Sequence, residues 1–220
     1  DSSYLVSAPY GIKMRFADDP VRIKDSHIEF ENFEMIANNG SPLDISGYLD
    51  FSNLDKMMLN AELKAKDFQV IDAKKNARSQ VYGKAFVDFS GQISGLLNNL
   101  QLTGKLNVLD NTDVSYILQD GTLATDDELN DLVKFTHFND STKQIIKRPD
   151  ITGFSMALIV DIDEQAHVFC ALSPDQSNYI DFVGGGNLLL NYDPTNGVQV
   201  RGRYTLSDGQ MKYSLPVIPL

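Results

Sequence analysis

The stretch that decides the fold reads VGGGNLLLNYDPTNGVQVRGRYTLSDG, from Val183 to Gly209. Its three consecutive glycines raise the question of a phosphate-binding loop. The dinucleotide fingerprint G-x-G-x-x-G would need glycine where Leu189 stands, and a helix should come after it. Instead, apolar and polar residues alternate on both sides of DPTNG, which is typical of a strand, a turn and a strand. We therefore expect a hairpin that begins at Gly184–Gly186 and turns at DPTNG.

The same period of two runs through most of the chain. Apolar residues alternate with polar ones over residues 43–51, 59–65, 81–89, 100–108, 154–162 and 198–206. Residues two apart point to the same side of a strand, so each run has one apolar and one polar face. Strict alternation favours an antiparallel sheet with one wet face over the buried strands of a parallel α/β fold. We expect residues 1–220 to form a single elongated all-β domain.

Glycines recur at inward places of this alternation, in DISGYLDF, QVYGKAFVDF, QLTGKLNV and QVRGRYTL. Glycine inside a strand often marks a bend, a bulge or close approach of another backbone. Repeated bends predict a long curved antiparallel sheet. Within 111–150 we expect an excursion from the sheet with one short helix near 126–136, because Thr125 and Glu128 form a capping-box pattern.

Composition excludes several classes of protein. The formal net charge is −11 in 220 residues, which argues against a nucleic-acid partner, since phosphates are neutralised by Lys and Arg. A single cysteine, Cys170, allows no intrachain disulfide. The longest apolar run, MALIV, is far shorter than the roughly 20 residues that span a bilayer. The chain starts without Met and ends on LPVIPL, so we expect a fragment of a longer protein.

No catalytic or metal-binding motif emerges from the sequence. His27, His137 and His167 are scattered without paired spacing, and there is no G-x-S-x-G nucleophile elbow. The acidic cluster at 126–131 lacks EF-hand spacing and is better interpreted as helix capping. We expect no enzyme activity, no catalytic residue, no cofactor and no metal.

Three segments carry a family resemblance. GKAFVDFSGQISGLLNNLQLTGKLNVLDNTDVSYIL, DDELNDLVKF and GGGNLLLNYDPTNGVQVRGRYTLSDGQMKYSLPVIP resemble the C-terminal domain of TamB-like proteins. These are the translocation and assembly module proteins of the AsmA-like group, and the order of segments is similar to the Bacteroidetes type. The resemblance covers residues 43–220, is most specific from Gly184 onward, and leaves the first 40 residues unmatched.

The resemblance implies that the curved sheet is rolled into a taco-like open groove or a barrel-like roll with an apolar interior. It also implies a non-enzymatic role in outer-membrane biogenesis. The resemblance implies that family members are anchored in the inner membrane by an N-terminal helix and extend through the periplasm. We expect that helix to lie outside these 220 residues. They are implicated in assembly and secretion of outer-membrane proteins with a barrel partner, and in phospholipid transport. The implied partners are phospholipid or another acyl-chain ligand, the outer-membrane barrel and neighbouring modules of the same chain.

If the sheet stays open, its apolar face forms a groove, and if it closes, the same residues form an ordinary core. Two other functions stay open: a protein-binding module that templates strands by edge pairing, and an unrelated extracellular β-sandwich binding domain. The candidate groove-lining residues are Leu43, Ile45, Leu49, Phe51, Leu59, Leu63, Val87, Phe89, Leu102, Leu106, Val108, Met156, Leu158, Val160, Leu188, Leu190, Val200 and Tyr204.

Overall fold

The computed structural model describes residues 4–17, 20–76, 79–118 and 153–213, and these form thirteen strands and two short 3-10 helices. The elements are β1 (Tyr4–Ser7), η1 (Ala8–Tyr10), β2 (Ile12–Phe16), β3 (Arg22–Lys24), β4 (His27–Ile36), β5 (Pro42–Asp50), η2 (Leu54–Lys56), β6 (Met58–Ala73), β7 (Val81–Leu96), β8 (Asn99–Val108), β9 (Asp113–Ile117), β10 (Gly153–Ile162), β11 (His167–Ala171), β12 (Tyr179–Asp193) and β13 (Gly197–Lys212). The prediction of an all-β fold is confirmed. The helix predicted near 126–136 lies outside the described residues.

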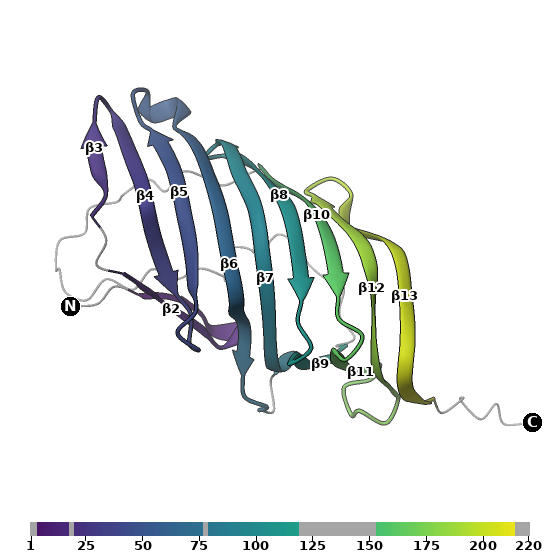
Figure 1. The fold of residues 1–220 in the computed structure, drawn as a ribbon. Helices are drawn as coiled ribbons and strands as arrows, with labels where there is room; N and C mark the ends of the chain where they lie inside the picture. The colour runs from purple at the N-terminus through teal and green to yellow at the C-terminus, as the bar shows by residue number, and fades with distance from the viewer. Residues whose placement is uncertain (1–3, 18–19, 77–78, 119–152, 214–220) are drawn as a thin grey trace, which may run out of the picture.

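All strands belong to one sheet. Figure 1 shows β3 to β8, β10, β12 and β13 side by side, with β2, β9 and β11 at one end, the lower end in the view. Neighbouring strands from β4 to β8 are antiparallel, as the alternation predicts. Two pairs, β8 with β10 and β9 with β11, are parallel, which corrects the expectation of a wholly antiparallel sheet. Parallel pairs need a crossover of a dozen or more residues, and the chain between Ile117 and Gly153 is long enough.

Two long strands close the sheet into a barrel-like ring. β7 pairs with β8 along Val87–Leu96 and with β9 along Val81–Lys84. In the same way β12 pairs first with β11 and then with β10. The ring of β7, β8, β10, β12, β11 and β9 therefore has six strands, and the remaining strands lie outside it.

A pair of corners makes this change of partner possible. Thr112, between β8 and β9, is buried, and its hydroxyl donates to Phe86 O and accepts from Phe86 N. Its carbonyl accepts the amide of His167, at 2.9 Å, on the neighbouring corner between β10 and β11. The first part of the predicted excursion is thus strand β9 within the sheet, and residues 119–150 of it lie outside the described residues.

The glycine run lies inside β12, not at the start of the hairpin, which corrects that prediction. Gly184 and Gly185 are buried where β12 passes from β11 to β10, and the register with β13 shifts at this point. A Cβ at Gly185 would meet the carbonyl of Ile162, and one at Gly186 the carbonyl of Arg203. The glycines therefore allow three backbones to approach at the corner. The turn does fall at DPTNG, where Asp193 Oδ1 accepts the amides of Thr195 and Asn196.

Candidate functional site

The apolar face of the sheet is ordered in rows that cross the strands. Residues directly opposite each other in a ladder share a face. We number the rows from the lower end of Figure 1. The first contains Leu43, Ala65, Phe89, Leu106, Val160, Leu188 and Gly202; the second, Ile45, Leu63, Gly91, Gly104, Leu158, Leu190 and Val200; the third, Gly47, Ala61, Ile93, Leu102, Met156, Tyr192 and Val198; and the fourth, Leu49, Leu59, Gly95, Leu100 and Phe154.

At the lower end this face is covered and forms a core. Ala37, Ala65, Phe68 and Val87 are buried together, and Met14 of β2 packs against them. η1 and β2 contact β6 here, and η1 also contacts β7. We call this region the closed end. The short elements η1 and β2 thus cover this end of the face.

Rows two to four, which we call the upper rows, have a different environment. The core cluster includes residues of the first row but none of the upper rows. Most of the large apolar side chains in the upper rows, among them Leu63, Leu102 and Met156, are half-buried. Exposure grows toward β13, where Val200 is 55% exposed and Val198 65%. The upper rows therefore keep apolar surface accessible among the described residues.

The predicted lining residues divide between these two environments. Leu43, Val87, Phe89, Leu106 and Val108 belong to the closed-end core or pack against it. Leu158 and Val160 are also buried, inside the ring. The half-buried positions outside that core are Ile45, Leu49, Phe51, Leu59, Leu63, Leu102, Met156, Leu188, Leu190 and Tyr204, and Val200 is exposed. Of these, Phe51 lies one residue beyond the end of β5.

Phe68 and Met14 are among the residues of the closed-end core that were not predicted from the sequence, although the sequence does contain a signal for Met14. Phe68 is buried at a bulge of β6, where the register with β7 shifts between Ala65 and Phe68. The bulge breaks the alternation, so a strict period of two misses Phe68. Met14 lies in IKMRF, a short alternating run that could have been recognised as a strand.

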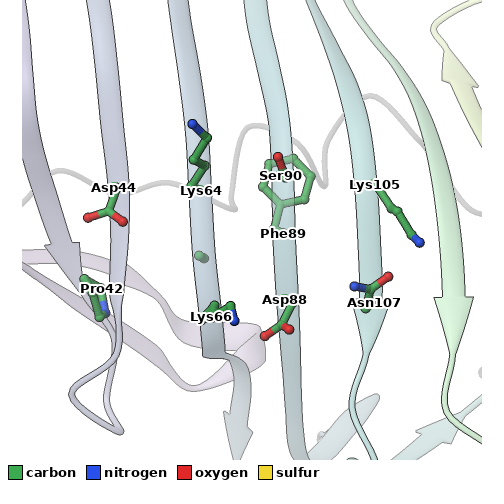
Figure 2. Close-up of a pocket in the computed structure, with 10 residues that line it drawn as sticks. Pro42, Asp44, Lys64, Lys66, Asp88, Phe89, Ser90, Lys105 and Asn107 are labelled. Carbon is green, nitrogen blue, oxygen red and sulfur yellow. The ribbon is translucent and has the colours of Figure 1, made fainter.

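The opposite, polar face holds a cavity of about 510 Å³ over β5 to β8. Figure 2 shows Asp44, Lys64, Lys66 and Asp88 along its floor, with Lys105 and Asn107 beside them. Lys105 Nζ lies 2.6 Å from Asp161 Oδ2. This hydrogen bond is the main cause of the lowered pKa of Asp161, and a hydrogen bond from Asn187 is the second cause. Positive and negative side chains alternate across the floor, as they do on an ordinary solvated face of a sheet. The lining of this cavity therefore does not indicate a particular ligand.

The remaining polar groups do not assemble a catalytic centre or metal site in the described ranges. No group of three or more His, Cys, Asp or Glu side chains there is placed to hold a metal ion. His27 lies beside Asp50 on β5, far along the sheet from His167, and His137 lies outside the described residues. Cys170 is half-buried, and burial raises the pKa of its thiol. Nor does any helix of the described residues have the length and apolarity to cross a membrane.

Comparison with known proteins identifies the family. The family model of the TamB C-terminal domain matches residues 31–215, from β4 to just beyond β13. Searches of curated proteins and of solved structures gave no match. The matched range includes every strand of the upper rows. On that match, which covers most of its length, the chain belongs to the TamB C-terminal domain family.

Proposed function

We propose that the upper rows hold the acyl chains of phospholipids, and that the domain contributes this carrier surface to outer-membrane biogenesis without catalysing a reaction. Family membership supports a role in outer-membrane protein assembly. The proposal adds lipid transport, a periplasmic location, and a parent protein of the AsmA-like group. That parent would have an inner-membrane anchor, neighbouring modules and an outer-membrane barrel partner.

One observation carries the proposal: apolar side chains continue in register beyond the core. The second and third rows each cross seven strands, from β5 to β13. Ile93, Leu102 and Met156 keep part of their surface accessible, in contrast to Val87 in the core at 4% exposure. A large accessible apolar patch on a folded domain marks a binding surface more often than not.

The energetics of acyl-chain burial fit a surface with no specific polar motif. Burial of a methylene group contributes about 0.8 kcal/mol. A chain of about 16 carbons would therefore gain on the order of 10 kcal/mol before the entropy costs of binding. Such a ligand can be bound without a hydrogen bond. A carrier of this kind therefore requires strands with one apolar face and room for the acyl chain, and no specific sequence motif.

Matched substitutions on the two faces of β8 and β10 test the proposal. The purified chain is incubated with phosphatidylglycerol vesicles and separated from them, and the lipid retained by the protein is extracted and counted. We expect the double variant Leu102→Gln and Met156→Gln to lose at least several-fold of the retained lipid. The matched control, Thr103→Gln with Ser155→Gln on the opposite face, should bind like the wild type. Absence of retained phospholipid in the wild type, or equal loss in both variants, would contradict the proposal.

A second function, templating of nascent barrel strands, is favoured by the outer edge of β13. This strand of 16 residues pairs with β12 and with no other strand in the described part of the chain. Val198, Val200, Leu206 and Met211 are exposed along it. By contrast, the other edge of the sheet is divided into short pieces: β3 pairs with one end of β4, β2 pairs with the other end, and β4 has a bulge between them. A long unprotected edge is the usual template for β-augmentation.

Crosslinking distinguishes this function from lipid carriage. A photoreactive residue at position 199 on β13 should capture unfolded outer-membrane protein if the edge templates strands. The same residue at position 101, in the middle of the sheet, is the control. Capture at position 101 alone, or at neither position, would reject the templating function.

A further inference from the structure

A histidine between two carboxylates lies in the part of the six-stranded ring that is formed by β9, β11 and β12. His167 of β11 has its Nδ1 2.8 Å from Asp113 Oδ1 on β9 and its Nε2 2.7 Å from Asp181 Oδ1 on β12. Ionised carboxylates only accept hydrogen bonds, and a neutral imidazole has a single N–H. Both bonds can form together only when His167 is an imidazolium.

We infer that His167 is a pH-sensitive latch that holds β9 and β11 against β12 and so keeps the ring closed. The three residues belong to three different strands of the ring, and β9 in turn pairs with β7. β9 and β11 have only five residues each, so their ladders alone give limited stability. Loss of the proton from His167 removes one of the two hydrogen bonds and the electrostatic attraction of the imidazolium to both carboxylates. The inference does not depend on what occupies the upper rows.

The charges around the latch come from the strands on either side and from one turn. Lys84 of β7 stands opposite Asp113 in the ladder, and Gln210 of β13 donates to Asp181 Oδ2 at 3.1 Å. Asp208 of β13 stands opposite Val183, two residues along β12 from Asp181. Asp163 and Glu164 occupy the turn before β11. The imidazolium thus has a carboxylate at each of its two nitrogens, with one lysine opposite Asp113, and protonation is favoured.

The direction of titration gives the pH window. The hydrogen bond with Asp181, with a smaller contribution from Asp113, raises the pKa of His167 above its ordinary value despite partial burial. The same bond, with that of Gln210, lowers the pKa of Asp181. The His167 contribution is therefore complete below its unfolded pKa of about 6.5 and is lost as pH rises through the higher folded value. The Asp181 contribution is lost only as pH falls below about 4.

Nuclear magnetic resonance of the whole chain, with its histidine rings labelled, tests the latch directly. We expect the imidazole of His167 to titrate with a midpoint above about 6.5, with both ring nitrogens protonated below that midpoint. Asp113→Asn and Asp181→Asn each keep the side-chain shape and remove a charge, and each should lower the midpoint. Backbone amide signals of residues 113–117 and 167–171 should shift with the same midpoint, while those of β5 and β6 should not.

The pH dependence of thermal stability tests the latch independently of resonance assignments. Between pH 6 and pH 9 the melting temperature of the wild type should fall by about 2–4 °C more than that of His167→Gln. His27→Gln, at the far edge of the sheet, is the matched control and should behave like the wild type. A wild-type midpoint at or below about 6.5, or midpoints unchanged in both Asp→Asn variants, would overturn the latch.

Discussion

The two ends of the apolar face are built from the same strands and differ in what covers them. At the closed end, Phe68 and Val87 are 6% and 4% exposed, under β2. Farther along the same strands, Ile93 and Leu59 are half-buried in the upper rows. Alternation therefore places apolar residues on one face, while bulges, corners and the N-terminal strands decide which part of that face becomes core.

Truncation of one large side chain at each end should show the largest effect. Phe68→Ala should cost about 3–5 kcal/mol of unfolding free energy, because it opens a cavity in the core. Leu102→Ala should cost only about 1–2 kcal/mol, since that side chain is half-buried and leaves no enclosed cavity. Urea unfolding measures both. Equal costs at the two sites would mean that the upper rows are as well covered as the core.

Substitution of a glycine in β7, where this strand pairs with β9, should have an intermediate effect on stability. Gly83 has φ +111°, and a Cβ there would meet the carbonyl of Asp113 across the β7–β9 ladder. Gly83→Ala should cost about 1–3 kcal/mol and disturb the pairing of β9. Gly197→Ala is the matched control, because Gly197 has φ +66° but open space around it, and should cost about 1 kcal/mol. If Gly197→Ala were the more destabilising variant, the close approach of β9 to Gly83 could not be the cause of the destabilisation by Gly83→Ala.

The smallest effect is expected on the polar face. Removal of the ammonium group in Lys105→Gln should raise the pKa of Asp161 toward its ordinary value, because that hydrogen bond is the main cause of its lowering. The stabilisation by Asp161 is present above its unfolded pKa and lost as pH falls through the lowered one, so at neutral pH the variant loses the part of it that comes from Lys105. Carboxyl titration by nuclear magnetic resonance measures the pKa. Lys64→Gln, whose partner is Glu62, should leave Asp161 unchanged.

Much of this architecture could be predicted from alternation alone. Apolar residues of separate runs, such as Ile45, Leu63 and Leu158, do share one face in the ladder. The family assignment on the GGGNLLLNYDPTNG region is confirmed, and it rules out an unrelated β-sandwich. The Bacteroidetes type, the groove and its ligand stay predictions.

The parts that could not be predicted depend on contacts between distant residues. Parallel pairing of β8 with β10 joins residues about 50 positions apart, and local periodicity does not encode such a pairing. His167 has no spacing motif, because Asp113 and Asp181 reach it only through the closure of the ring. The cover of the closed end likewise depends on Met14, which lies far from Phe68 and Val87 in the sequence.

The central claim, that acyl chains bind the upper rows and not the closed end, is tested most directly by a phospholipid with a photoreactive acyl chain. After illumination, the labelled residues are identified by peptide mass spectrometry. We expect labels around Leu102 and Met156 in the upper rows, and none at Phe68 or Val87. Labels confined to the polar face, or spread without preference over both ends, would contradict the claim.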